Sequence, residues 1–91
     1  MSFEIRCVIK GIVQGVSFRF FVKSVAEYMN ISGEVKNMKD GSVFVLAQGE
    51  KESLEKFIHF LKKGNSKSVV DDVSVSWLEP VKNYNNFNIS R

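Results

Sequence analysis

Two short stretches, residues 11–19 and residues 33–41, contain the side chains and spacings that could do chemistry. The first is rich in glycine, follows a predicted strand and opens a predicted helix with Arg19 in its first turn. Backbone N–H groups at such a helix start, together with an always-ionised guanidinium, form a seat for a phosphate. The second stretch is a predicted strand that ends at Asn37 before a tight turn. Together they predict an anion-binding loop, a fixed positive charge and one neutral amide.

Each stretch also has a purely structural interpretation. Gly11 and Gly15 could serve only a tight strand-to-helix connection, with Arg19 on the surface, because glycine patterns are common. Asparagine before a turn often caps its own backbone, and Asn37 fits that role too. In the functional hypothesis, Arg19 and the loop amides bind an anion while the Asn37 side-chain oxygen orients a water. The amides are those of Gln14, Gly15, Val16, Ser17 and Phe18.

Length and composition restrict the class of protein. With 91 residues, of which 44% are hydrophobic and 25% charged, we expect one globular domain over residues 1–91. Residues 3–6 include charges, which argues against a signal peptide, and no stretch approaches the roughly 18 apolar residues of a membrane span. We therefore expect a cytoplasmic protein without a membrane partner. We also expect a monomer.

Metal and nucleic-acid functions have little support in the composition. A single cysteine, Cys7, excludes an intramolecular disulfide, and with a single histidine, His59, it leaves no soft-metal site by spacing. We expect neither a metal nor another cofactor. The net charge of +3 is small for a dedicated nucleic-acid binder, so no nucleic-acid partner is expected.

The elements that must position these residues follow from the hydrophobic period. Alternating apolar residues predict strands at residues 3–10, 31–36, 43–47, 73–77 and 87–89. Apolar spacings of three and four predict helices from about Ser17 to near Asn30, and from Glu50 to Lys63 before the capping glycine Gly64. The order is strand, helix, strand, strand, helix, strand, with a short last strand.

That order predicts an α+β fold, the ferredoxin-like sandwich, with a mostly antiparallel sheet and two helices on one face. Its usual spatial strand order is four, one, three, two. Strands one and two then run in the same direction with strand three between them. The loop after Gly11 and the turn after Asn37 should therefore emerge at one edge, about 10 Å apart. A phosphate with its attacking water could span this gap.

The same residues resemble a known family. The chain is similar to both signatures of acylphosphatase, and the resemblance extends over essentially its whole length. The matching residues are Gly11, Val13, Gln14, Gly15, Val16, Phe18 and Arg19, followed by Gly33, Val35, Asn37, Asp40 and Gly41. The resemblance implies a ferredoxin-like enzyme that hydrolyses small acyl phosphates to a carboxylate and inorganic phosphate. It also implies that Arg19 and the loop amides bind the phosphate and that Asn37 positions the nucleophilic water.

The chemical inventory suits such a substrate. An acyl phosphate has a carboxylate leaving group that departs without protonation, so a general acid is dispensable. Phosphoryl transfer to a good leaving group needs mainly positioning and charge stabilisation. Ser17 lacks a base in the motif that could activate it, so direct attack by water is the favoured hypothesis.

Four positions depart from the family pattern. Asn30 stands where a glycine is common and Glu34 where a tryptophan is common. Asn65 and Ser68 stand where a proline and an alanine are usual. We expect none of the four to touch the phosphate loop, Arg19 or Asn37, and therefore to affect loop conformation and stability more than activity.

Two other classes of function remain open. A ferredoxin-like RNA-binding module would present aromatic and basic residues on the open sheet face, where Phe44 is the one clear aromatic candidate. A non-catalytic phosphate- or carbamoyl-phosphate-binding domain, such as the one at the start of a larger maturation protein, would keep the phosphate loop without the hydrolysis.

Overall fold

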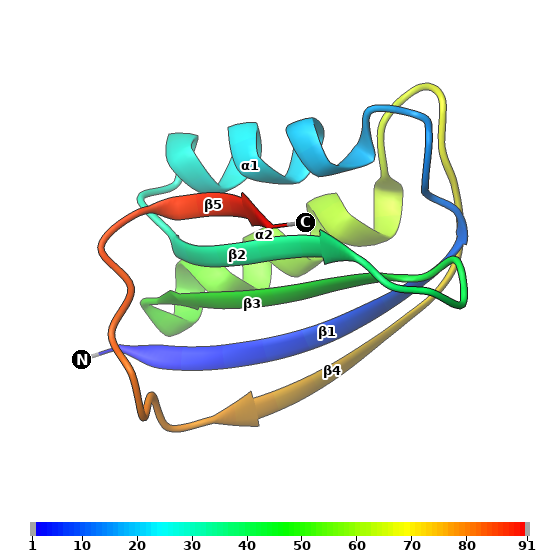
Figure 1. The fold of residues 1–91 in the computed structure, drawn as a ribbon. Coiled ribbons are helices and arrows are strands. Elements are labelled where there is room, and N and C mark those ends of the chain that lie inside the picture. Colours follow the sequence, from blue (N-terminus) through cyan, green and yellow to red (C-terminus); the bar gives the residue numbers. More distant parts are fainter. Residues whose placement is uncertain (1, 91) are drawn as a thin grey trace.

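The computed structural model describes residues 2–90. Seven elements follow in the expected order (Figure 1). They are β1 (Phe3–Ile12), α1 (Phe18–Tyr28), β2 (Ser32–Asn37), β3 (Val43–Gly49), α2 (Lys51–Lys63), β4 (Val69–Leu78) and β5 (Phe87–Ser90). The strands form one sheet in the order β4-β1-β3-β2-β5, and both helices lie against the same face of it. The predicted ferredoxin-like fold is confirmed, with β5 added parallel to β2 at the edge.

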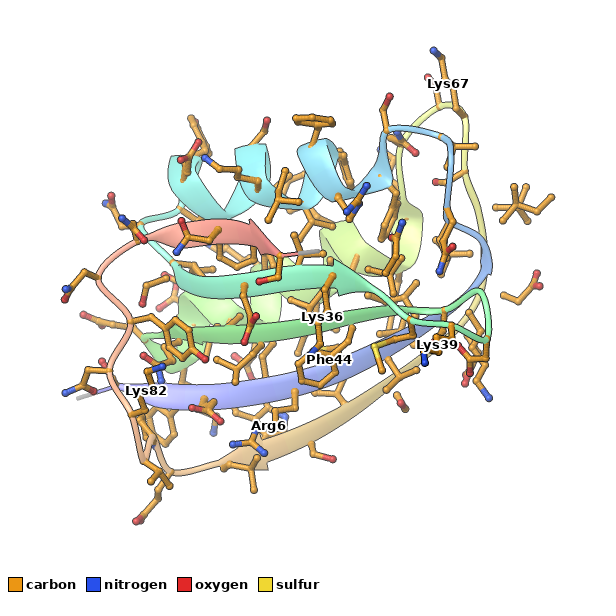
Figure 2. All side chains as sticks on the ribbon, viewed as in Figure 1. Arg6, Lys36, Lys39, Phe44, Lys67 and Lys82 are labelled. Atoms are coloured by element: carbon orange, nitrogen blue, oxygen red, sulfur yellow. The ribbon has the colours of Figure 1, made fainter. Side chains whose placement is uncertain are left out.

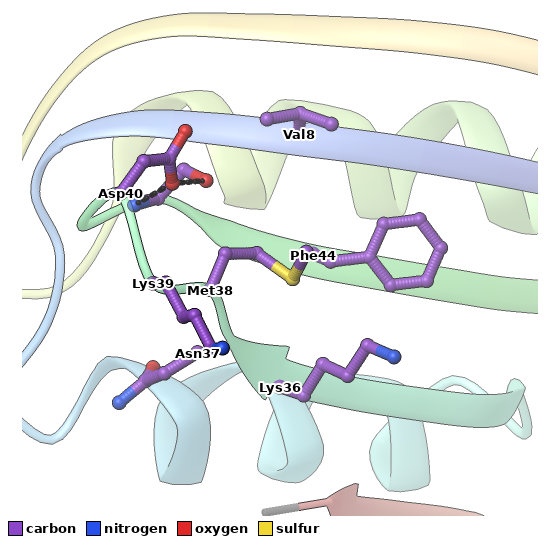
Figure 3. A pocket seen from close by; sticks show the side chains of 8 residues that line it. Val8, Lys36, Asn37, Met38, Lys39, Asp40 and Phe44 are labelled. Carbon is purple, nitrogen blue, oxygen red and sulfur yellow. Dashed lines mark hydrogen bonds between the residues drawn. The ribbon is translucent and has the colours of Figure 1, made fainter.

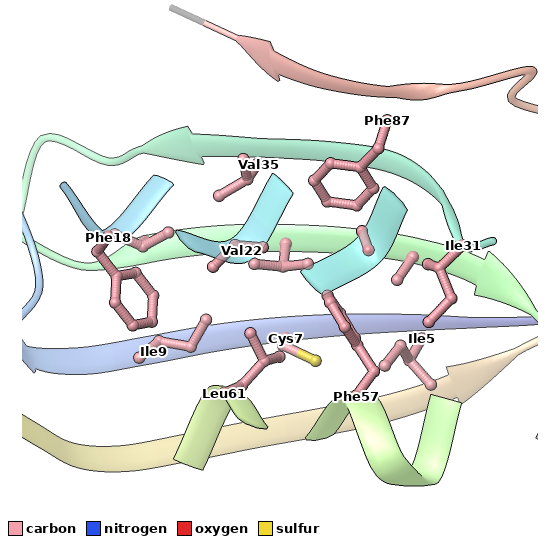
Figure 4. Packing of buried hydrophobic residues seen from close by; sticks show 14 of the residues in the cluster. Ile5, Cys7, Ile9, Phe18, Val22, Ile31, Val35, Phe57, Leu61 and Phe87 are labelled. Carbon is pink, nitrogen blue, oxygen red and sulfur yellow. The ribbon is translucent and has the colours of Figure 1, made fainter. Parts of the chain in front are cut away.

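The core lies between the sheet and the two helices. Apolar residues at every second position of β1 face the helices, and those at spacings of three and four on α1 and α2 face the sheet. The fully buried apolar members of β1 and the helices are Ile5, Cys7, Ile9, Phe18, Val22, Ala26, Leu54, Phe57 and Leu61 (Figure 4). Phe57 of α2 meets Phe87 of β5 edge-on, with ring centres 6.3 Å apart, which fastens the last strand to the core.

The pairing of β1 with β4 extends further than the sequence pattern predicts. A register shift between Lys10 and Gly11 lets β1 continue to Ile12, opposite Val69, so β4 begins four residues before residue 73. Gly11 has a φ of +134°, and a Cβ at this position would overlap the carbonyl oxygen of Val69. Gly11 therefore serves close strand pairing at a bulge and lies outside the predicted anion-binding loop.

Three connections meet at one end of the sheet. Both β1 and β2 pair antiparallel with β3, so they run in the same direction and their carboxyl ends share an edge, as predicted. Figure 1 shows the loop between β1 and α1, the β2–β3 turn and the α2–β4 loop at this end. No helix within residues 2–90 is long and apolar enough to cross a membrane.

Candidate functional site

Helix α1 begins without the usual partners for its first N–H groups. Its N-cap residue, Ser17, has left-handed backbone angles (φ 61°, ψ 23°), makes no side-chain capping hydrogen bond, and is followed by a first turn without an acidic residue. The helix begins with the hydrogen bond from Phe21 N to Ser17 O, 3.1 Å long, so the preceding amides have no acceptor inside the helix. By contrast, α2 carries Glu52 in its first turn. The start of α1 is suited to an external anion.

A hollow of about 240 Å³ lies at this helix start. Residues of both sequence stretches line it: Gly15, Ser17, Phe18 and Arg19 come from the first, and Asn37 comes from the second. Val13, also from the first stretch, and Phe20 complete its lining. The fold thus brings the predicted guanidinium, the predicted amide and three residues of the predicted loop around one small cavity.

Arg19 is held in part by the last strand. Its Nη1 donates to the carbonyl oxygen of Ser90 at 3.4 Å, and the side chain is half-buried. A guanidinium has five N–H donors, so this contact leaves others for an anion. Ser90 belongs to β5, which lies parallel beside β2, the strand that ends at Asn37. The strand β5 therefore links the Arg19 guanidinium to the strand that carries Asn37. The sequence contained no signal for this contact, which joins residues 71 positions apart.

Asn37, the last residue of β2, has an unsatisfied acceptor. Its Oδ1 is buried and has no hydrogen-bond partner among residues 2–90. A buried acceptor without a donor costs about 1–3 kcal/mol, so a donor that reached this oxygen would be bound favourably. Backbone capping by this oxygen, the structural alternative for Asn37, is not seen.

Asp40 stabilises the β2–β3 turn instead. Its Oδ1 accepts from the hydroxyl of Ser42 at 2.5 Å and from the backbone N–H of Ser42 at 3.0 Å. These two bonds, the hydroxyl foremost, lower the pKa of the Asp40 carboxyl. The interpretation of residues 40 and 41 as a turn signal is confirmed.

The side chain of Gln14 has a role that the sequence reasoning missed. Its Nε2 donates to the carbonyl oxygens of Met38 at 2.8 Å and of Ser42 at 2.9 Å. The amide thereby ties the predicted phosphate loop to the turn that follows Asn37. The partners lie 24 and 28 residues away in the sequence, so spacing could not reveal them.

The expectation that no departing position touches the phosphate loop is wrong for Asn65. Its Nδ2 donates to the carbonyl oxygen of Val16 at 2.9 Å, because the α2–β4 loop packs against the loop that precedes α1. Glu34 makes an indirect link: it accepts from the Ser90 hydroxyl at 2.7 Å, and the carbonyl of Ser90 accepts from Arg19.

The sheet face opposite the helices carries a larger hollow, of about 590 Å³, beside the β2–β3 turn. Val8, Met38 and Phe44 line it together with Lys36 and Lys39 (Figure 3). The Lys36 ammonium lies 5.6 Å from the centre of the Phe44 ring, and Figure 2 shows the lysines and Phe44 on this open face. An RNA-binding sheet of this fold stacks two or three bases on aromatic side chains. Along the middle strands β1 and β3, Phe44 is the one aromatic residue facing this side.

Potential metal ligands are dispersed. Cys7 is buried in the core, and burial raises the pKa of its thiol to about 12, while His59 is exposed on α2. Within residues 2–90, no group of three His, Cys, Asp or Glu side chains is placed to hold a metal ion.

Known proteins match this chain over nearly its whole length, including the residues that line the hollow. A family model described as acylphosphatase matches residues 5–89. An acylphosphatase of Thermotoga maritima is 43% identical over 81 residues, covering 89% of each chain. The crystal structure of acylphosphatase from Bacillus subtilis has a TM-score of 0.95 at 36% identity and covers 98% of this chain and 99% of its own. Full-length HypF, in its phosphate- and nucleotide-bound form, matches all of this chain over 12% of its length, with 35% identity and a TM-score of 0.86.

Proposed function

We propose that this chain, which belongs to the acylphosphatase family, hydrolyses the carboxyl–phosphate anhydride of small acyl phosphates. The observation that carries the proposal is that Arg19, the loop at the start of α1 and Asn37 line the same hollow. The products are a carboxylate and inorganic phosphate. Such a reaction needs charge stabilisation and a positioned water, and these are what the lining residues supply.

The phosphate is held by backbone and side-chain donors together. The backbone amides of residues 14–18 and the guanidinium of Arg19 donate to its oxygens, and the helix dipole of α1 adds a favourable field. The planar fork of arginine matches two phosphate oxygens at once. The contact of Arg19 with Ser90 supports this role because it limits the side-chain freedom lost on binding.

The nucleophile is a water that donates to the Asn37 side-chain oxygen. It attacks phosphorus opposite the leaving group; an oxygen–phosphorus bond forms, the anhydride bond to phosphorus breaks, and its electron pair leaves with the carboxylate. The proton released by the water passes to solvent. Ser17 makes no hydrogen bond to a histidine or carboxylate in the part of the chain the structure describes, which supports attack by water over a phosphoserine intermediate.

Benzoyl phosphate hydrolysis by variants of the two side chains tests the proposal. We expect Arg19→Gln to lower kcat/KM at least about a hundredfold and to weaken competition by inorganic phosphate. Asn37→Ala should lower kcat by a similar factor while phosphate competition stays near that of the wild type. Lys39→Gln, which removes one positive charge from the neighbouring turn, is the matched control. Full activity of both site variants, or trapping of a phosphorylated Ser17, would contradict the mechanism.

The likeness to HypF supports a second candidate, a phosphate-binding domain without turnover. It predicts phosphate binding that depends on Arg19, with no hydrolysis of benzoyl phosphate by the wild-type chain. The same assay therefore separates the two functions. The proposal also includes a monomer in the cytoplasm, a single domain over residues 1–91, and no nucleic-acid partner.

A further inference from the structure

The α2–β4 loop holds one peptide of the proposed phosphate-binding loop, which comprises residues 14–18. Asn65 Nδ2 donates to Val16 O at 2.9 Å, across 49 residues of sequence. The backbone of Asn65 is itself restrained, because the Ser68 hydroxyl accepts from Asn65 N at 3.0 Å and donates to Asn65 O at 3.1 Å. A hydrogen bond from Ser68 N to Asn65 O, 3.2 Å long, closes the same turn. The donor that reaches Val16 therefore stands on a fixed backbone.

The direction of this hydrogen bond determines the direction of the next N–H. The peptide between Val16 and Ser17 is trans, and in a trans peptide the C=O and the N–H point in opposite directions. Since the carbonyl of Val16 is turned toward Asn65, the N–H of Ser17 is turned away from the α2–β4 loop. Ser17 lines the hollow that also contains Arg19 and Asn37.

The backbone strain at Ser17 favours the loss of this peptide orientation. Its φ of 61° lies in the left-handed region, which costs a residue with a side chain about 1–2 kcal/mol. A flip of the peptide between Val16 and Ser17 would return that φ to the ordinary negative range. The flip would also turn a carbonyl oxygen, in place of an N–H, toward a bound anion. An acceptor facing phosphate would oppose binding.

We propose that Asn65 is a positioning residue that prevents this flip and so keeps the Ser17 N–H directed at the phosphate. The role rests on the proposed function of the loop. It predicts that losing the Asn65 donor weakens anion binding while the core and the fold remain intact, because Asn65 is a half-buried loop residue. The Asn65 Oδ1 is buried and unpaired among the described residues, so an apolar replacement breaks only the side-chain hydrogen bond to Val16 O.

Titration with inorganic phosphate, followed by backbone amide NMR, tests the role. Asn65→Leu keeps the branched shape and the neutral charge but removes the donor, and Asn65→Ala is a second variant in case the larger leucine does not fit. We expect phosphate to bind about fivefold more weakly to both, the loss of one hydrogen bond. The phosphate-induced shift of the Ser17 amide should largely disappear, whereas that of Gly15 should persist. Ser66→Ala, an exposed neighbour in the same loop, should match the wild type.

A purely structural role for Asn65 predicts a different pattern. It would lower the unfolding temperature and leave phosphate affinity and the Ser17 shift unchanged in the folded variants, which would overturn the positioning role alone. A wild-type titration in which phosphate shifts neither Gly15 nor Ser17 would overturn the proposed phosphate loop, and the role of Asn65 with it. Wild-type shifts at both amides, lost only at Ser17 in the variants, support both inferences.

Discussion

Gln14→Met should uncouple the two halves of the site while nearly preserving side-chain size. In the native structure Gln14 Nε2 donates to Met38 O and Ser42 O at 2.8 and 2.9 Å, and each bond contributes about 0.5–1.5 kcal/mol. Both carbonyls keep another donor: Gly41 N lies 3.2 Å from Met38 O, and Met38 N lies 2.8 Å from Ser42 O. Neither acceptor is left without a partner, so the expected loss is about 1–2 kcal/mol.

A loss of that size should lower the unfolding temperature by about 5–15 °C for a domain of this length. The loss of activity should be larger than the loss of stability alone would cause, because the turn that Gln14 holds follows directly after Asn37. A displacement of about 1 Å at a reacting group can cost a hundredfold in rate, and we expect kcat for benzoyl phosphate to fall at least about tenfold. Phosphate competition should change little, because the backbone amide of Gln14 remains.

Thermal unfolding and benzoyl phosphate kinetics on the same samples measure both effects. Asn88→Ala is the control. It removes an exposed 2.8 Å hydrogen bond from Asn88 Nδ2 to the side chain of Asn86, two residues earlier in the sequence. It should leave kcat unchanged. If Gln14→Met has wild-type kcat despite the expected loss of stability, the turn does not need this tether to position Asn37, and the reasoning is refuted.

Three further predictions concern the scaffold. Gly11→Ala should destabilise the protein by about 2–4 kcal/mol in urea unfolding, because its Cβ would overlap Val69 O, whereas Gly15→Ala, with open space around it, should cost only about 1–2 kcal/mol for its positive φ. Cys7 should resist thiol reagents until the protein is unfolded. Since burial raises its pKa from 9.0 to about 12, its contribution to stability is complete below pH 9 and is lost as pH rises toward 12; Cys7→Val should lack that part of the alkaline decline. Gln48→Leu should cost about 2–4 kcal/mol and speed amide exchange at Tyr84, because Gln48 binds the buried Glu4 and the Tyr84 N–H at once.

Local sequence determined the element order and singled out Arg19 and Asn37, the two side chains that we propose as the principal site residues. Arg19 follows a glycine loop at a helix start, and Asn37 ends a strand before a turn; both positions are defined by short-range periodicity and turn chemistry. The antiparallel pairing of β1 and β2 with β3 then placed them at one edge, a consequence of topology that the element order already contained. Element ends were less predictable: the exposed Asp71 and Asp72 interrupt the apolar alternation of β4 and concealed its start.

Tertiary structure alone decided which groups support those two residues. Gln14 reaches the turn after Asn37, Asn65 reaches Val16, and Ser90 reaches Arg19, each across at least 24 residues. It also reassigned Gly11 from the loop to a strand bulge. A polar side chain can find its partner anywhere that the packed loops bring a carbonyl within hydrogen-bond distance, and that proximity depends on how α2, β4 and β5 pack around the core. Periodicity reports how one element presents its faces, but it carries no information on which loops from distant elements meet at its end.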